Sequence, residues 1–186
     1  MNKISKVFYV GSIYGCGFLS IIIVVFGLFL LDVEFLKIKT NYFYVPSLTA
    51  IPEAAIILFL GFGMMIYSWV AWLFLVHRLW VVIQNGDVRT TPGRAVGFMF
   101  IPLWGWYWMY KTFWGWSVDC NHYIKRRGII APPVSEGVPL AYCILFTVSL
   151  IPVFTPIAFV AMFFLMVLWL NQSIDAANKI LERGNL

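Results

Sequence analysis

The run VFYVGSIYGCGFLSIIIVVFGLFLL, residues 7–31, contains 25 residues and no charged side chain. An α-helix rises about 1.5 Å per residue, so a helix of this length is longer than the roughly 30 Å hydrocarbon core of a bilayer. Backbone polar groups in lipid must be paired within a helix or a closed barrel, and this run lacks the alternation of barrel strands. The run therefore predicts a transmembrane helix.

Two further apolar runs predict additional spans. Residues 54–76 form an uncharged stretch of 23 residues. Residues 138–170 form an uncharged stretch of 33 residues, which is long for one crossing and short for two full ones. Pro152 and Pro156 divide this last stretch, because proline ends or kinks a helix.

We therefore expect an all-α fold, a polytopic membrane helical bundle with about four transmembrane helices. The spans are expected at about residues 7–31, 54–76, 134–151 and 156–172. The last span is expected to continue into a cytoplasmic helix at about 172–183, because apolar residues recur there at helical spacing. The whole chain then forms a single membrane domain.

The composition leaves little material for a water-soluble domain. Of the 186 residues, 62% are hydrophobic and 11% are charged, whereas about a quarter of the residues in a soluble domain are charged. The mean hydropathy is +0.87. The first apolar run is too long for the apolar core of a signal peptide and ends without a small-residue cleavage site, so we expect it to be retained.

The positions of the 13 lysines and arginines predict the topology. Only Lys37 and Lys39 lie between the first two spans, and the other eleven lie outside that loop. The positive-inside rule then places both termini and the long middle loops in the cytoplasm. The lipid bilayer is the expected partner. The net charge of +5 reflects topology, and no direct nucleic-acid binding is expected.

Residues 95–118 allow two interpretations. Ten of the nineteen residues from Phe98 to Trp116 are aromatic, and Pro102 and Lys111 interrupt the apolar character. Tryptophan and tyrosine concentrate at membrane interfaces, so we expect a broken, interfacial or re-entrant element on the cytoplasmic side. Its candidate interface residues are Trp104, Trp106, Trp108, Trp114 and Trp116. A proline-kinked third crossing is the alternative.

Part of this region resembles a known group of sequences. TPGRAVGF at residues 91–98, FIP at 100–102 and WYW at 106–108 resemble uncharacterised bacterial multispan membrane proteins that carry a "TPG(K/R)AVGFxFIP…YW" signature, a domain of unknown function. Asp119 and Asn121 continue the pattern, and the segment 169–181 is similar to the closing "QxxDAIN" helix of that group. The group often has asparagine where this chain has Gly105 and Trp106. The resemblance implies a bacterial inner (plasma) membrane location and a similar arrangement of spans, and it implies no activity.

Asp119, Cys120, Asn121 and His122 form the densest group of potential ligands or catalytic side chains. A metal site needs three or four converging ligands, and neighbours along one helix do not converge, so neither a metal nor another cofactor is expected. We interpret the group as a solvated interfacial turn in which Asp119 caps a helix or pairs with a lysine or arginine. The alternative is a lipid-modifying enzyme with Asp119 and His122 as acid and base.

Two other pairs are candidates with simpler explanations. His77 and Arg78 close the second span, where cationic side chains commonly extend to the interface; a pH-sensing role for His77 is the alternative. Gly11 and Gly15 form a Gly-x-x-x-Gly step that would let helices approach closely. This step is a candidate packing face within the monomer or between copies.

The three apolar runs contain no aspartate, glutamate, lysine or arginine, although ion-coupled transporters usually need such a charge within the membrane. We therefore expect a non-enzymatic sensor, anchor or assembly subunit that acts through self-association or through a membrane or cytoplasmic partner. The first alternative is an oligomeric pore or small transporter, with Ser149, Asn171 or Gln172 facing its axis. A lipid-modifying membrane enzyme is the second alternative.

Overall fold

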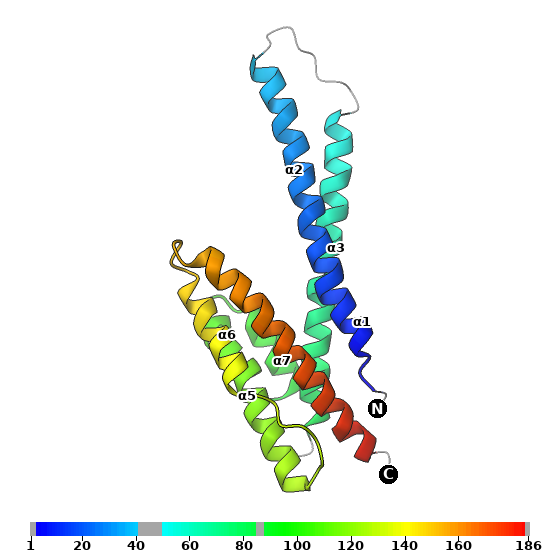
Figure 1. Cartoon of the computed structure of the whole chain (residues 1–186), viewed down its shortest axis with the longest axis vertical. Helices are drawn as coiled ribbons and strands as arrows, with labels where there is room; N and C mark the ends of the chain where they lie inside the picture. Colours follow the sequence, from blue (N-terminus) through cyan, green and yellow to red (C-terminus); the bar gives the residue numbers. More distant parts are fainter. Residues whose placement is uncertain (1–2, 41–49, 85–87, 185–186) are drawn as a thin grey trace. The chain divides into compact units, whose positions relative to one another are not determined.

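The computed structural model describes residues 3–40, 50–84 and 88–184 (Figure 1). These ranges contain helices and no strand, which confirms the predicted all-α fold. In chain order the elements are α1 (Lys6–Val10), the π-helix η1 (Gly11–Gly15), α2 (Cys16–Thr40), α3 (Ala50–Val82), α4 (Pro92–Gly97), the 3₁₀ helix η2 (Phe98–Phe100), α5 (Trp104–Arg127), α6 (Gly137–Val148) and α7 (Thr155–Gly184).

Three helices are long and apolar enough to cross a membrane, at Lys6–Val33, Glu53–Val82 and Thr155–Arg183. They correspond to three of the four predicted spans. The chain divides into two compact units. The first, called here the helical pair, covers residues 7–72, and the second, called the bundle unit, covers residues 3–6 and 73–184.

Close contact within the helical pair depends on three glycines. A Cβ atom added at Gly17 would lie 2.9 Å from Ser68 Oγ, and one at Gly27 would lie 2.9 Å from Leu58 Cδ2. A Cβ at Gly61 would lie 2.7 Å from Val24 Cγ2. Small residues at helix contacts in membranes allow the backbones to approach, so these three positions set the spacing of α2 and α3.

The predicted packing step at Gly11 and Gly15 lies before α2 and is not one of these three contact positions. Both residues are exposed, in the π-helical segment η1, and no atom lies within 4 Å of an added Cβ at either. This step therefore makes no packing contact in the described chain. A π-helical segment frees backbone carbonyls from their usual partners, and Ser68 Oγ donates to the carbonyl of Ile13 at 2.8 Å.

In the bundle unit, α5, α6 and α7 pack around aromatic side chains. Helices α5 and α6 are antiparallel, because Trp106 contacts Phe146 near one end whereas Asn121 bonds to Val134 near the other. Trp169 of α7 lies at the centre of the unit. Its ring meets Phe113 edge-on, and its Nε1 donates to Ser117 Oγ of α5 at 2.9 Å.

The C-terminal part of α3 belongs to the bundle unit and turns one face to its core. The residues that are almost fully buried are Leu75, Val76, Leu79 and Trp80 of α3, and Ile83 directly after its end. Their spacing of three and four residues is that of a helical stripe facing a core. The helix continues to Val82, beyond the end of the predicted span at residue 76.

The predicted span at about 134–151 is shorter in the structure. Helix α6 covers only Gly137–Val148, 12 residues, or about 18 Å at 1.5 Å per residue. Pro132 and Pro133 lie in the non-helical segment before it, and Pro139 lies in its first turn, where a missing amide hydrogen leaves no bond unmade. Apolar composition alone extended the prediction past these boundaries.

The aromatic element is broken, as expected, but its second half is longer than predicted. Helix α4 begins after Thr91, whose side chain accepts from Arg94 N. The chain breaks between η2 and α5, and there an added Cβ at Gly105 would lie 2.5 Å from Met99 O, which explains the glycine. Helix α5 then runs to Arg127, well beyond residue 118. Gly128 ends it with φ at 57°, the left-handed conformation that glycine adopts freely.

Candidate functional site

Five polar side chains in the bundle unit together hold three segments of chain, and we call them the clamp residues: Asp119, Asn121, Gln172, Asp175 and Asn178. The first two lie on α5 and the other three on α7. The spacing of three residues along α7 places its three members along one side of the helix. Together they hold the loops and the N-terminal segment against one end of the bundle unit.

Asp119 holds the loop after α3. Its Oδ1 lies 3.0 Å from Arg89 Nε, and its Oδ2 accepts from the backbone N of Arg89 at 3.0 Å. The carboxylate is only 4% exposed, whereas the Arg89 side chain is 47% exposed. The interpretation of Asp119 as part of a solvated turn is therefore wrong, because the residue lies inside α5 and is buried. Its partner is an arginine, one of the two residue types considered.

Asn121 holds the segment between α5 and α6. Its Nδ2 donates to the Val134 carbonyl at 2.8 Å, and its Oδ1 accepts from Val134 N at 2.9 Å. The same Nδ2 reaches Glu136 Oε1 at 3.0 Å. Gln172 adds a bond from α7, because its Oε1 accepts from Ser135 N at 2.9 Å. Both carboxamides therefore stabilise the path of one loop.

Asp175 and Asn178 hold the N-terminal segment against α7. Asn178 Oδ1 accepts from Ile4 N at 2.7 Å, and its Nδ2 donates to Ile4 O at 2.9 Å. Asp175 pairs with Lys6 at 2.9 Å. Ile4 itself is almost fully buried. Residues 4–6 and the C-terminal part of α7 therefore lie together within the bundle unit.

Glu182 adds a third contact between the two ends of the chain. It accepts from Lys3 at 2.9 Å and from Lys179 at 3.0 Å. These hydrogen bonds lower the pKa of the Glu182 carboxyl below its usual value. The pairs are exposed, so each contributes little alone; their role is to fix the position of a segment already held by Asn178.

The remaining polar neighbours of Asp119 do not form a reactive group with it. Cys120 is fully buried, and burial next to Asp119 raises its thiol pKa to about 12, so the thiol stays protonated and unreactive. His122 is exposed and lines an open cleft of about 410 Å³ with Lys125 and Arg126. Among the described residues no group of three potential ligands could hold a metal ion.

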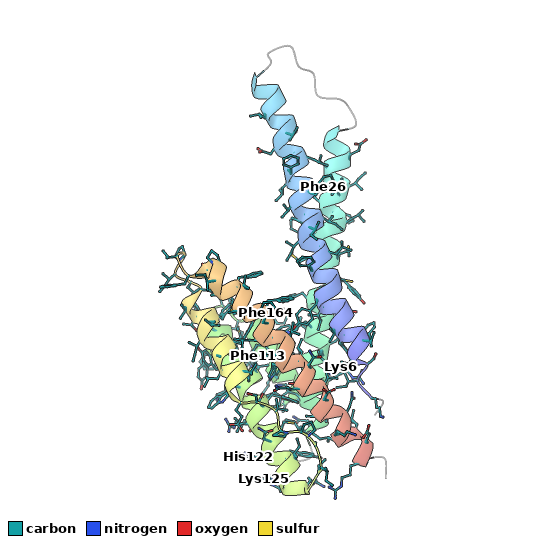
Figure 2. All side chains as sticks on the ribbon, in the orientation of Figure 1. Lys6, Phe26, Phe113, His122, Lys125 and Phe164 are labelled. Atoms are coloured by element: carbon teal, nitrogen blue, oxygen red, sulfur yellow. The ribbon has the colours of Figure 1, made fainter. Side chains whose placement is uncertain are left out.

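A second open cleft lies between the ends of α5 and α7, with a volume of about 340 Å³. Arg183 on its border donates to the carbonyls of Arg127 and Gly128, which satisfies the last carbonyl groups of α5. Arg127 in turn lies over the ring of Tyr123. In Figure 2, His122 and Lys125 lie at the end of the bundle unit where α7 finishes, and Phe164 lies nearer the start of α7.

The five candidate tryptophans occupy different environments. Trp104 is half exposed, Trp106 and Trp114 are partly buried, and Trp108 and Trp116 are buried. Trp108 packs edge-on against Phe98, and Trp116 against Trp169. Trp108 and Trp116 lie on the inner face of α5, where they are buried, so they cannot contact lipid headgroups. Trp104 remains available for contact.

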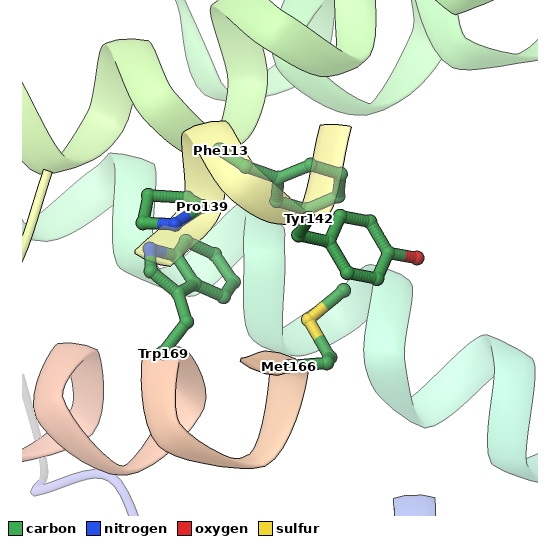
Figure 3. A pocket seen from close by; sticks show the side chains of 5 residues that line it. All are labelled: Phe113, Pro139, Tyr142, Met166 and Trp169. Atoms are coloured by element: carbon green, nitrogen blue, oxygen red, sulfur yellow. The ribbon is translucent and has the colours of Figure 1, made fainter. Parts of the chain in front are cut away.

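The core between α5, α6 and α7 contains a gap too small to hold a water molecule, lined by Phe113, Pro139, Tyr142, Met166 and Trp169 (Figure 3). Phe113 meets the rings of Tyr142 and Trp169 edge-on, at centroid distances of 5.9 and 5.1 Å. Edge-on ring pairs of this kind are ordinary core packing. The gap is therefore a packing space between rings.

The residues considered for a pore axis and for a pH sensor also have defined positions. Ser149 Oγ donates to Phe146 O, and Asn171 Nδ2 donates to Val167 O, each within its own segment. Gln172 serves as a clamp residue. His77 is exposed and Arg78 partly buried, and both lie within α3 rather than at its end.

The comparisons give no relative for this chain. No protein-family model, no curated protein and no solved structure matches it. The resemblance to the multispan signature proteins therefore stays a prediction. Asp119, Asn121, Gln172, Asp175 and Asn178, which carry part of that resemblance, are the clamp residues. In this chain they maintain the architecture of the bundle unit.

Proposed function

We propose that this membrane protein is a non-enzymatic anchor or assembly subunit that acts by associating with further copies of itself. The observation that supports the proposal is that the clamp residues form structural contacts within the bundle unit. The polar side chains that would be candidates for chemistry bind the loops and the N-terminal segment instead. What results is a fixed, basic surface at one end of the bundle unit rather than a reaction site.

We further propose a bacterial inner-membrane location with both termini in the cytoplasm. The bonds between Asn178 and Ile4 support a common side for the two ends, because residues in contact cannot lie on opposite sides of a bilayer. The distribution of lysine and arginine supports the cytoplasm as that side.

Self-association is assigned to the open step at Gly11 and Gly15. Small residues at the surface of a membrane helix allow a second helix to approach closely. Both positions are exposed, and no described atom lies within 4 Å of an added Cβ. A larger side chain would therefore leave the fold of the monomer intact and interfere only with a neighbouring copy.

The test measures oligomeric state in mild detergent by light scattering, together with ion flux in liposomes. We expect an oligomer without flux, and we expect Gly11→Leu with Gly15→Leu to convert it to monomer. Gly63→Leu is the matched control, because Gly63 is equally open. A wild-type monomer at every concentration would contradict self-association. Measurable flux would support the pore instead.

The enzyme alternative is tested at His122, which is exposed and lies outside the clamps. His122→Ala should leave the structure and the cellular role of the protein unchanged. Loss of that role with retained folding would contradict the non-enzymatic proposal.

A further inference from the structure

The hairpin formed by α6 and α7 is too short on one side for a full crossing. Helix α6 has 12 residues, about 18 Å, against a hydrocarbon thickness of roughly 30 Å. Polar contacts mark where the hairpin leaves the apolar region, since Val134 is held by Asn121 and Ser135 by Gln172. Glu136 is the last charged residue before the turn, because residues 137–154 contain no aspartate, glutamate, lysine or arginine.

The turn itself is apolar and projects outwards. It reads SLIPVF at residues 149–154. Val153 is 80% exposed, and Ile157 at the start of α7 is 77% exposed. Leu150, Ile151 and Phe154 are each at least half exposed. A turn that emerged into water would carry polar residues, whereas these side chains suit contact with acyl chains.

Hydrogen bonds within the turn provide an independent observation. The backbone N–H groups of Ser149, Leu150 and Ile151 donate to carbonyls of α6, at 2.8, 3.4 and 3.0 Å. Those of Phe154 and Thr155 donate to the carbonyls of Ile151 and Pro152, at 3.0 and 3.3 Å.

The side chains of the turn add to this pairing. Thr155 Oγ1 donates to the Ser149 carbonyl at 2.7 Å, and Ser149 Oγ donates to the Phe146 carbonyl at 2.7 Å. The two prolines at 152 and 156 bring no N–H group that would need a partner. Irregular backbone is costly in hydrocarbon when its polar groups are unpaired, and this turn pairs most of its donors internally.

We propose that the α6–α7 hairpin is a re-entrant element, with its turn at residues 149–154 ending among the acyl chains and both its ends on the same side of the membrane. The partner of its exposed apolar surface is lipid hydrocarbon. The two full crossings expected from the sequence would also return the chain to its starting side, so the charge distribution agrees with either arrangement. The proposal depends on residence in a bilayer and is independent of the anchoring role.

Cysteine labelling in sealed proteoliposomes tests the proposal. The background replaces Cys16, Cys120 and Cys143 with alanine, and single cysteines are placed by Val153→Cys, Asn41→Cys and Lys125→Cys. An impermeant maleimide should label the last two from opposite sides, and Val153→Cys from neither side until detergent is added. Labelling of Val153→Cys with the sidedness of Asn41→Cys would show a crossing. Labelling with the sidedness of Lys125→Cys would show a hairpin in water. Either result would overturn the proposal.

A charge substitution tests the same point without replacing the native cysteines. Val153→Lys places an ammonium group at the turn, and Ile130→Lys is the control because Ile130 is 97% exposed in the loop after α5. A charge at the hydrocarbon centre is strongly disfavoured. We expect Val153→Lys to lower the melting temperature in lipid and to make the protein elute as more than one species. We expect Ile130→Lys to do neither. Equal behaviour of the two variants would contradict a turn in hydrocarbon.

Discussion

The side chain of Asn178 bonds to both backbone polar groups of Ile4: Oδ1 accepts from the Ile4 N–H at 2.7 Å, and Nδ2 donates to the Ile4 carbonyl at 2.9 Å. The two residues are 174 positions apart in the chain. A carboxamide presents its donor and its acceptor on two separate atoms at the same end of the side chain, so it can bond to an N–H group and a carbonyl together. The N-terminal segment is therefore fixed before the first span begins.

Replacing this carboxamide should loosen the N-terminal segment. Asn178→Leu keeps the size of the side chain but leaves both polar groups of Ile4 without their partner, which should cost about 1–3 kcal/mol. Asn171→Leu is the control, because Asn171 Nδ2 donates to the Val167 carbonyl within α7 and so holds no separate segment among the described residues. Thermal denaturation in detergent measures the difference. Equal melting temperatures for the two variants would contradict the role assigned to Asn178.

Asp119 should tolerate amidation better than truncation. Asp119→Asn keeps an acceptor for Arg89 N and loses the ion pair, whereas Asp119→Ala loses both. We expect Asp119→Ala to cost about 2–3 kcal/mol, since bonds to charged groups contribute more than neutral ones, and Asp119→Asn to cost less. Unfolding in denaturant provides the ranking, and the reverse order would show that the N–H bond contributes nothing.

Two glycines of α3 should differ in their tolerance of alanine. Gly61→Ala brings a methyl group to 2.7 Å from Val24 Cγ2 and 3.2 Å from Val24 N, and such overpacking costs about 1–3 kcal/mol. Gly63→Ala meets nothing within 4 Å and should change stability by less than about 0.5 kcal/mol. Both are read from the melting temperature in detergent. A destabilised Gly63→Ala would indicate a contact with another copy at that position.

Two buried tryptophans form a matched pair. Trp169 Nε1 donates to Ser117 Oγ, whereas Trp116 Nε1 is buried without a hydrogen-bond partner among the described residues. Trp169→Phe and Trp116→Phe remove the same volume, so their difference reports the hydrogen bond. We expect Trp169→Phe to be the more destabilising by about 1 kcal/mol. Denaturant titrations of both variants check this value, and equal losses would assign the effect to volume alone.

Acid should release the contact at Glu182. Lys3 and Lys179 lower its pKa in the folded protein, so the contact stabilises at pH values above the ordinary carboxyl range and is lost as the pH falls through the lowered value. Access of a protease to the N-terminal segment should therefore increase below about pH 4.5, the ordinary value. Glu182→Gln should remove this change, and a response that persists in this variant would assign it to another carboxyl group.

The structural features that could be predicted from the sequence are those that depend on neighbouring residues in the chain. The three apolar runs that match long helices and the break near Pro102 each follow from local spacing. The spacing of Gly11 and Gly15 is equally local, but it does not reveal which side of a helix meets its neighbour. The glycines in contact are Gly17, Gly27 and Gly61, which have no shared spacing that marks them.

The sequence predicted an arginine or lysine as a partner of Asp119, but for a related reason it did not identify Arg89 or the partners of the other clamp residues. Asp119 and Arg89 are 30 positions apart, and Asn178 and Ile4 are 174 apart, so no pattern within a window connects them. A weaker signal was present on α7, where Gln172, Asp175 and Asn178 recur every three residues next to apolar positions. Polar residues that recur on one side of a helix next to apolar positions indicate a face with fixed partners.

The uncharged turn of the α6–α7 hairpin has a consequence for how the protein enters the membrane. Between Gly137 and Leu170 no ionised group has to be carried through the hydrocarbon. The paired backbone of residues 149–155 can form before insertion, so the hairpin can enter as one folded piece from the side on which the chain is made. Biogenesis of this part therefore requires no translocation of a charged loop.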